Sequence, residues 1–375
     1  MNSQLDVLKD LAQKKALLEP TRVDLELHRG LADACGSRQS WMERFERVTQ
    51  GPHALSESEF HYYQLYRPEV TEAEIGSYIG KAMQMELHDR CNSPLWIATS
   101  GDKALFELIL KGAGLPVSNT LAILARSPRS GFARQLKSKH DLREFLVGQS
   151  QPVFCKPIDG MFGIGAFLIE AVEGDMVRLV ERPPESLDDF YTYLSQFSLS
   201  GYMFQEVIAQ SPFMAERFGA GVATVRFLVF NSGDPKVVSA VLRIPKADAI
   251  ADNFWQSGNL LAGIDIETGQ ISRAIQNCGD RFQEISQVPA TGGEMRGCKL
   301  QAWRDAVQLV LSAATLFPEV GTQSWDIAFS QAGPLAVEYN WGGDLNLHQL
   351  ANRRGLYDAS YRAHVSRFNN TRLNL

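Results

Sequence analysis

The sequence lacks most of the features that mark secreted, zinc-binding or membrane-spanning proteins. It has only 5 cysteines, which are widely scattered, form no CxxC pair and lie in no Cys/His cluster with zinc spacing. It contains no long apolar run, and charged residues interrupt its first twenty positions, so we expect no secretion signal. We therefore expect a cytoplasmic protein with reduced thiols and without a membrane partner.

The chain also lacks an excess of basic residues. Its 37 Lys and Arg stand against 43 Asp and Glu, a formal charge of −6, which argues against a broad nucleic-acid surface. A length of 375 residues with 45% hydrophobic content argues against disorder and allows two or three domains. The charge is uneven, however, because residues 101–160 hold 9 basic and 5 acidic residues, a local net charge of +4. This local excess suits a polyphosphate ligand.

Changes in residue pattern divide the chain into three predicted parts. Residues 1–100 are mostly helical and carry no chemistry-bearing motif; a capping box at Thr71–Glu74 is predicted to open a helix that runs through Leu87. Residues 101–207 alternate helices and short strands. Residues 208–375 are dominated by two hairpins with a helix between them. Locally paired strands with interspersed helices predict an α+β fold of packed layers.

The sharpest local motif is a glycine-rich loop that begins with a lysine. Lys156 ends a predicted strand and is followed by Gly160, Gly163 and Gly165, before the next strand at 167–169. Glycines let backbone N–H groups approach phosphate oxygens, and the lysine adds a positive charge. A P-loop would end in Gly-Lys-Ser/Thr, and a dinucleotide fold would continue as a helix. We interpret the segment as a glycine-tipped flap; the alternative is a plain hairpin turn.

Two acids face each other in the last predicted hairpin. If the three residues 331–333 form its turn, Asp326 lies opposite Glu338, and Asn340 shares their face because strand side chains alternate. Opposed carboxylates repel each other unless a divalent cation bridges them. Two carboxylates and an amide oxygen suit Mg²⁺, which completes its shell with water and phosphate oxygens. The alternative is a solvent-facing polar strand edge.

Together these motifs resemble the ATP-grasp superfamily, in which ATP lies between two α+β lobes. Their order is similar: Lys156 with its glycine loop, then an acidic strand, then Asp326 and a Glu-x-Asn motif. The segment from about 100 to 350 is most similar to the sugar-transfer-associated ATP-grasp family, which the runs ATVR (223–226) and VLRI (241–244) also resemble. The resemblance implies an ATP-grasp fold of two lobes, 101–207 and 208–375, after a mostly helical N-terminal domain.

The resemblance also implies a role for each group of residues. The implied ligands of the ATP phosphates are Lys103, Lys156, Gly160, Gly163 and Gly165. The implied adenine contacts, on a hinge strand over 204–208, are Gln205, Glu206 and Ile208. The implied ligands of one or two Mg²⁺ are Asp326, Glu338 and Asn340. The implied contacts to the γ-phosphate or the substrate carboxylate, which also stabilise the transition state, are Arg226 and Arg243.

This set of residues favours a ligase that uses ATP and Mg²⁺ to join a carboxylate to an amine through an acylphosphate. The expected partners are a small-molecule carboxylate and an amine, with sugar or amino-acid character, and no nucleic acid; a homodimer is left open. One alternative is a kinase that phosphorylates a hydroxyl, with His348 or Asp344 as general base. The other is a non-catalytic nucleotide-binding scaffold.

Overall fold

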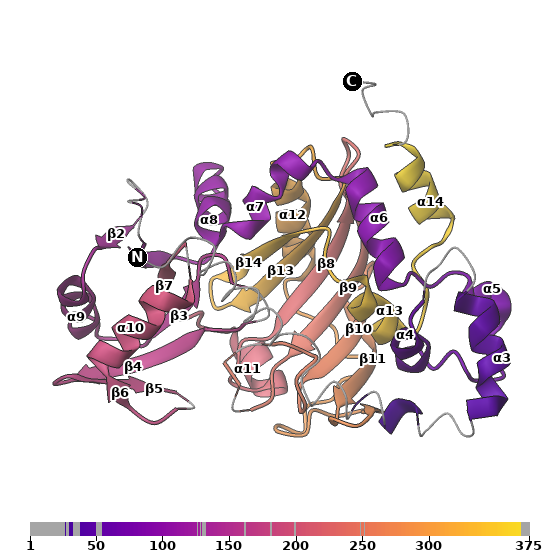
Figure 1. Ribbon diagram of the computed structural model, residues 1–375, viewed down its shortest axis with the longest axis horizontal. Helices are drawn as coiled ribbons and strands as arrows, with labels where there is room; N and C mark the ends of the chain where they lie inside the picture. Colours follow the sequence, from indigo (N-terminus) through magenta and orange to yellow (C-terminus); the bar gives the residue numbers. More distant parts are fainter. Residues whose placement is uncertain are drawn as a thin grey trace, which may run out of the picture.

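Two sheets, each of seven strands, dominate the structure, a computed structural model (Figure 1). It describes residues 27, 30–32, 38–49, 55–125, 127, 129, 133–160, 163–180, 182–198, 200–247, 249–250 and 252–368. The smaller lobe lies at the left of Figure 1, and the second sheet runs through the centre with helices beyond it. The predicted α+β fold with two lobes and a helical N-terminal region is confirmed.

The small lobe contains the first of the two sheets. In spatial order its strands are β2 (Arg134–Leu136), β1 (Thr120–Leu124), β7 (Tyr202–Glu206), β3 (Val153–Pro157), β4 (Phe167–Glu173), β5 (Met176–Leu179) and β6 (Glu185–Ser186). Helices α9 (Lys139–Val147) and α10 (Leu187–Phe197) pack on this sheet through a core that contains Phe145, Phe190 and Phe204. Cys155 is also buried in this core, on the face opposite to Lys156, as strand alternation requires.

The second sheet is an antiparallel series. Its strands, in spatial order, are β12 (Phe282–Glu284), β11 (Gln270–Asn277), β10 (Leu260–Asp265), β9 (Lys236–Ile244), β8 (Thr224–Phe230), β13 (Thr322–Ser330) and β14 (Gly333–Trp341). The β-branched and aromatic residues of β8 and β13 favour strands. One face packs against α12 (Trp303–Ala314) in a core that includes Phe227 and Trp325. The hairpins predicted on either side of α12 are present, whereas β10 and β11 were not predicted.

Helices from both ends of the chain cover part of the opposite face. They are α3 (Arg38–Thr49), α4 (Glu57–Tyr62), α5 (Glu72–Ile75), α6 (Lys81–Cys91), α13 (Leu345–Asn352) and α14 (Ala359–Ser366). Trp41, Phe60 and Tyr63 share a core with Val241 and Leu261 of the sheet. The described part of the first hundred residues is therefore packed against the second sheet (Figure 1). The division at residue 100 stays a prediction.

Helix α8 (Lys103–Gly112) lies between the two sheets. Phe106 and Leu110 belong to the core of the second sheet, and the ring of Phe106 stacks on Tyr339 of β14 at 6.3 Å. On its other side, Ala104 packs with Ile123 and Met203 of the small lobe. The side chain of Asp102 caps the helix by accepting hydrogen bonds from the next turn. The first residue of α8, Lys103, is thereby placed at the junction of the lobes.

Three shorter helices lie between the longer elements in the described part of the chain. The remaining helices are the 3₁₀ turn η1 (Pro94–Trp96), α7 (Ala98–Gly101) and α11 (Pro212–Phe218).

The capping box at Thr71 is present, but the helix that it opens ends at Ile75. Gly76 ends it, and a second helix begins after Gly80, so the prediction of one helix through Leu87 is wrong. In the part of the chain that is described, no helix is both long and apolar enough to cross a membrane.

Candidate active site

A buried ionic network lies on the face of the second sheet opposite to the one that packs on α12. Arg226 of β8 pairs in register with Asp326 of β13 and donates two hydrogen bonds to its carboxylate, both of 2.7 Å. The guanidinium of Arg243 on β9 forms ion pairs with the same carboxylate at 2.8 Å and with Asp252 at 3.1 Å, and it donates a hydrogen bond of 2.8 Å to the Thr224 hydroxyl. Three neighbouring strands therefore hold two guanidinium groups around one acid.

The network determines the charge of its members. Burial alone would raise the pKa of Asp326, but the ion pairs with Arg226 and Arg243 outweigh it and hold the pKa at about 2. Burial likewise disfavours the charged form of Arg226, and Asp326 overcomes this and raises its pKa above the usual value. Burial raises the pKa of Asp252, an effect that Arg243 opposes. The Arg226–Asp326 pair is therefore ionised at neutral pH.

The two predicted phosphate lysines converge on the edge of this network. Lys103 lies 3.2 Å from the Glu338 carboxylate and also donates to the backbone carbonyl of Gly160. Lys156 is buried at the end of β3. Burial, opposed by Glu338 and reinforced by Lys103, lowers the pKa of Lys156 to about 8. Lysines from α8 and β3 thus face the acids of β13 and β14.

The last hairpin pairs Asp326 with Glu338, but not through the predicted turn. Ser330 pairs with Gly333, so the turn has two residues instead of the predicted three, 331–333. A bulge between Asp326 and Ile327 then inserts one extra residue and shifts the register. The predicted opposition of the two acids is therefore present for a different reason. Strict alternation from Glu338 would put Ala336 on the face of the two acids, but the bulge turns Ala336 into the core on the other face.

The three predicted metal ligands lie near one another on the last hairpin. Asp326 and Glu338 are directly opposed, and Asn340, two residues on, pairs with Ser324. The amide nitrogen of Asn340 and the hydroxyl of Ser324 are buried without a hydrogen-bond partner among the described residues, which is rare in folded proteins. Within that same part of the chain, no group of three or more His, Cys, Asp or Glu side chains is arranged to hold a metal. A metal here would therefore depend on two carboxylates and an amide.

The glycine loop begins beside Lys103 and ends where β4 of the small lobe begins. Its tip, Met161 and Phe162, lies outside the described residues. Gly163 and Gly165 have φ values of 71° and 76°, which favour glycine. A Cβ atom on Gly165 would lie 2.5 Å from the ring of Phe197 and 2.9 Å from the Tyr202 hydroxyl. Gly160 is held by its carbonyl, which accepts from Lys103, so the loop is connected to α8.

The predicted hinge is shorter than expected. Strand β7 ends at Glu206, so Ile208 lies beyond it and not on a strand over 204–208. Gln205 is buried and donates to Glu107 at 2.9 Å, whereas Glu206 is exposed and accepts from Asn119 at 2.8 Å. These contacts leave Gln205 in a buried structural network. A role of the three residues at an adenine ring stays a prediction.

Three site residues had no prediction attached to them. Thr224 and Asp252 complete the Arg243 contacts, and the side chains of Thr224 and Asp252 are hydrogen-bonded to each other. Thr224 belongs to the ATVR run, which the sequence marks only through its family resemblance. Glu107 accepts from the Thr120 backbone at 2.8 Å and lies in the buried network of Gln205. Nothing in the sequence marks Glu107, one of several acids on a helix.

The residues proposed as kinase bases are engaged elsewhere. Asp344 caps α13 by accepting from the Asn346 backbone, and it lies 3.6 Å from Lys81. His348 is buried, and its Nδ1 lies 2.9 Å from the Ser239 hydroxyl. Burial, reinforced by the charge of Arg226, lowers the pKa of His348 to about 3. An imidazole with so low a pKa is a weak base.

The assembled cluster carries a positive charge. Its cations are Lys103, Lys156, Arg226 and Arg243, and its acids are Asp252, Asp326 and Glu338. Four cations against three acids give a net charge of +1, at a place where burial makes charge interactions strong. The Arg243 Nε atom is buried without a partner in the described part of the chain. The site therefore suits an anionic ligand.

Two α+β lobes with a glycine flap and a carboxylate hairpin define an ATP-grasp architecture. The model of the sugar-transfer-associated ATP-grasp family matches residues 82–364, most of the chain, and the protein belongs to this family. The match begins earlier than the predicted resemblance at about residue 100. A comparison with curated protein sequences found no match.

Solved structures with similar folds include three enzymes of low sequence identity. The D-alanine–D-alanine ligase from Coxiella burnetii has 12% identity over 72% of this chain and 58% of that chain, with a TM-score of 0.39. An N5-carboxyaminoimidazole synthase from Aspergillus clavatus has 11% identity over 70% and 51%, with a TM-score of 0.39. The VanG D-Ala:D-Ser ligase from Enterococcus faecalis has 11% over 72% and 60%, with a TM-score of 0.41. The chain thus spans between 51% and 60% of their lengths.

Proposed function

We propose that the protein is an ATP- and Mg²⁺-dependent ligase that joins a carboxylate to an amine through an acylphosphate. The observation that carries the proposal is the convergence of Lys103, Lys156, Arg226 and Arg243 on the acids of one hairpin. Phosphoryl transfer needs positioning and charge neutralisation more than a protein nucleophile, and this set supplies both. Membership of an ATP-grasp family supports ATP as the nucleotide.

The proposed chemistry has two steps. With Lys103 and Lys156 binding phosphate oxygens of ATP, an oxygen of the substrate carboxylate attacks the γ-phosphorus, and ADP leaves with the bonding electrons. The amine nitrogen then attacks the acyl carbon, inorganic phosphate leaves, and the nitrogen loses a proton. Arg243 has a buried Nε–H group free of hydrogen bonds within the described chain, which would stabilise the oxyanion of the second step.

Asp326, Glu338 and Asn340 would hold Mg²⁺ beside these groups. When bound, the ion neutralises phosphate charge and makes the phosphorus more electrophilic. Asp326 also orients Arg226 and Arg243, because its two oxygens accept from both of them. The same carboxylate would therefore both bind the metal ion beside the phosphates and position the two arginines that meet the substrate.

The kinase alternative is less well supported. It requires a general base near the acceptor hydroxyl, and Asp344 is engaged with a helix terminus while the pKa of His348 is about 3. A ligase needs no base with a pKa near neutrality for its first step, because a carboxylate is already ionised. The chemistry of the site therefore favours the ligase over the kinase.

Hydroxylamine trapping tests the proposal. The protein is incubated with Mg-ATP and pools of small carboxylates, including sugar acids and amino acids, together with hydroxylamine, which captures acylphosphates as hydroxamates. We expect ADP and a hydroxamate that both depend on one carboxylate. Arg243→Lys should lower the yield strongly, whereas Arg281→Lys, at an exposed arginine beside Asp280, should not. A phosphorylated hydroxyl product without hydroxamate would instead support the kinase.

A further inference from the structure

Glu107 is a buried acid on α8, the helix that lies between the two sheets. Its neighbour Phe106 packs in the core of the second sheet, whereas the side chain of Glu107 contacts the small lobe and is only 2% exposed. The carboxylate accepts hydrogen bonds from the backbone N–H and the hydroxyl of Thr120 on β1. It also accepts one of 2.9 Å from the side chain of Gln205 on β7. One acid thus joins a helix anchored on the second sheet to two strands of the small lobe.

A second branch of the same network reaches the next residue of β7. Lys111, one turn further along α8, forms an ion pair with Glu107 at 2.8 Å and donates to the side chain of Asn119 at 2.9 Å. The side chain of Asn119 donates to Glu206 at 2.8 Å, and its backbone carbonyl accepts from the Glu206 N–H at 3.0 Å. Gln205 and Glu206, the two residues of β7 that were predicted to contact adenine, are therefore both connected to α8 by this network.

The first residue of α8, Lys103, is held by contacts of its own. Its backbone N–H donates to the carbonyl of Ile158 at 3.1 Å, and its ammonium group donates to the carbonyl of Gly160. Both acceptors belong to the first part of the glycine loop, which follows Lys156 directly. The two predicted phosphate lysines are therefore kept together without help from Glu107.

The two attachments of α8 lie at different levels of β7. Lys156 pairs in register with Met203. Gln205, which binds Glu107, lies two residues further along the strand, about 7 Å at the usual rise. On the helix, Lys103 and Glu107 are one turn apart, about 6 Å. The phosphate lysines thus lie at one level of the helix and strand, and the predicted adenine contacts lie at the next.

We propose that Glu107 is a positioning residue that, with Lys111 and Asn119, holds β7 in place relative to the phosphate lysines, so that one ATP molecule meets both. This role rests on the proposed function, in which ATP lies between the lobes. A ligand held at two ends binds tightly only when both subsites are already at the right separation, because the protein then loses little conformational freedom on binding. Without Glu107 the phosphates would still meet the lysines, but the base would no longer meet a strand fixed in place.

Calorimetric titration of the full chain with ATP, ADP and inorganic tripolyphosphate, each with Mg²⁺, separates this role from a general loosening of the fold. The test variant is Glu107→Leu, which fills most of the space of the side chain but accepts no hydrogen bond. The second variant is Asn119→Ala, at an exposed residue where the loss of a side chain should not prevent folding. Burial lowers the pKa of Lys156 to about 8, and Glu107 is one of the acids that oppose this. Titration at pH 6.5 therefore keeps Lys156 protonated.

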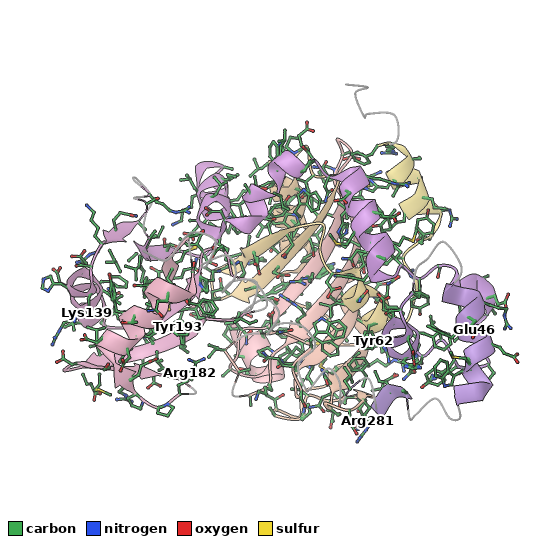
Figure 2. The ribbon with its side chains drawn as sticks, in the orientation of Figure 1. Glu46, Tyr62, Lys139, Arg182, Tyr193 and Arg281 are labelled. Carbon is green, nitrogen blue, oxygen red and sulfur yellow. The ribbon has the colours of Figure 1, made fainter. Side chains whose placement is uncertain are left out.

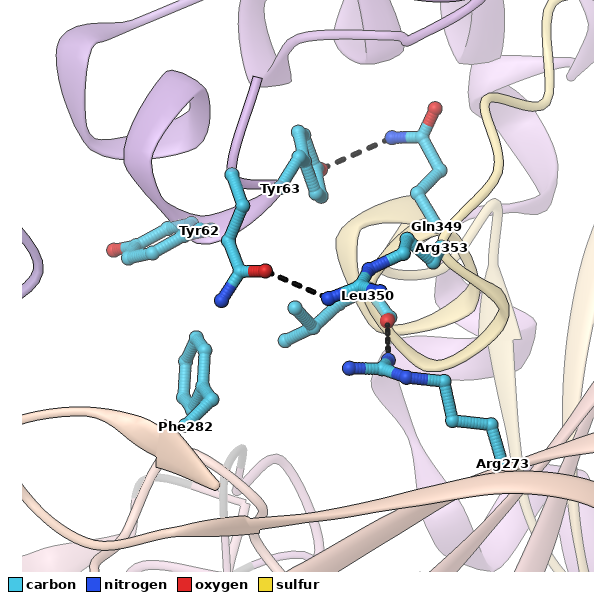
Figure 3. Close-up of a pocket in the computed structure, with 8 residues that line it drawn as sticks. Tyr62, Tyr63, Arg273, Phe282, Gln349, Leu350 and Arg353 are labelled. Atoms are coloured by element: carbon cyan, nitrogen blue, oxygen red, sulfur yellow. Dashed lines mark hydrogen bonds between the residues drawn. The ribbon is translucent and has the colours of Figure 1, made fainter. Parts of the chain in front are cut away.

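The control is Tyr63→Phe, which breaks a buried hydrogen-bond network elsewhere in the protein. The Tyr63 hydroxyl donates to Asn346 at 2.9 Å and accepts from Gln349 at 3.0 Å, and the second of these contacts is drawn in Figure 3. Its neighbour Tyr62 lies toward the end of the molecule opposite to Tyr193 of the small lobe (Figure 2). A loss of affinity caused only by a weaker fold would therefore appear in this variant as well.

We expect the unaltered protein to bind ATP at least tenfold more tightly than tripolyphosphate. Glu107→Leu should weaken the binding of ATP and ADP at least tenfold and that of tripolyphosphate less than twofold. Asn119→Ala should weaken ATP binding at least threefold, and Tyr63→Phe should change every affinity less than twofold.

Equal losses for ATP and tripolyphosphate in Glu107→Leu, or an unchanged ATP affinity in that variant, would overturn the positioning role. If Glu107→Leu does not fold, Asn119→Ala decides: a loss for ATP without a loss for tripolyphosphate supports the role, and an unchanged ATP affinity overturns it. A failure of the unaltered protein to bind ATP would overturn the proposed function, and the role of Glu107 with it.

Discussion

Arg226 and Asp326 face each other across strands β8 and β13 and share two hydrogen bonds of 2.7 Å. Both side chains are almost completely shielded from solvent, with exposures of 11% and 2%. Buried ion pairs contribute little net stability compared with apolar side chains, but breaking one is costly. The pair therefore acts mainly by orienting the guanidinium groups at the surface of the sheet.

Removal of the carboxylate should destabilise the protein. Asp326→Ala leaves Arg226 and Arg243 buried without their common acid, and we expect the free energy of unfolding to fall by about 3–5 kcal/mol. Urea denaturation followed by tryptophan fluorescence measures the loss. The control is Asp175→Ala, which removes the exposed pair with Arg143 and should cost at most about 1 kcal/mol. Equal losses for the two variants would contradict the buried network.

Lys156 should make stability depend on pH in the alkaline range. Its pKa is about 8 in the folded protein, against 10.5 as the ordinary value. Between these values the unfolded chain binds more protons than the folded one, so the contribution of Lys156 to stability rises with pH. Below pH 8 the buried charge costs about 3 kcal/mol, from 1.36 kcal/mol per pKa unit.

The stability difference between Lys156→Met and the unaltered protein isolates this effect. We expect the variant to be the more stable at pH 7 and its advantage to shrink as the pH rises from 8 to 10. Lys139→Met, at an exposed lysine paired with Asp188, should show no such trend. A pH-independent difference for Lys156→Met would mean that this lysine titrates normally.

The flap should tolerate a Cβ atom less well than an ordinary turn does. Gly165 and Gly174 both have a positive φ, but only Gly165 is crowded, by Phe197 and Tyr202. Gly174→Ala should cost about 1 kcal/mol through backbone strain alone. Gly165→Ala should cost at least about 1 kcal/mol more, because the ring of Phe197 must move. Thermal unfolding of the two variants measures the difference; equal midpoints would show that the flap is not tightly packed.

Gly165→Ala should also weaken ATP binding, whereas Gly174→Ala should not. The flap position depends on the close approach of Gly165 to Tyr202. A fluorescent ATP analogue titrated against both variants gives their affinities. We expect a loss of tenfold or more for Gly165→Ala. Unchanged affinity in a folded Gly165→Ala protein would argue against a role of this loop at the nucleotide.

The last hairpin shows how much of the site can be predicted from sequence patterns. Alternation and a turn of assumed length place Asp326 opposite Glu338, and this pairing is present. The turn is nevertheless one residue shorter, and a bulge before Ile327 compensates for it. A bulge depends on how the strand bends over its neighbours, which a local pattern does not reveal. The acids were predictable, but the face on which Ala336 lies was not.

Contacts between distant segments were the least predictable part. The buried contacts of Arg243 involve Thr224 and Asp252, and the latter lies in a loop whose path depends on tertiary packing. The packing of Trp41 and Phe60 against the second sheet also has no local signal. Helix propensity suggested one helix through Leu87, whereas Gly76 and Gly80 break it into two. Local patterns thus identify charged groups, and the fold decides which of them meet.

The central claim is that a substrate carboxylate attacks the γ-phosphorus of ATP. It is tested most directly with the carboxylate found by hydroxylamine trapping, labelled with ¹⁸O in both oxygens. The protein is given Mg-ATP, the labelled carboxylate and an amine, and the released inorganic phosphate is analysed by mass spectrometry. The account predicts one ¹⁸O atom in each phosphate released with amide formation. Phosphate free of the label, alongside the same amide product, would contradict it.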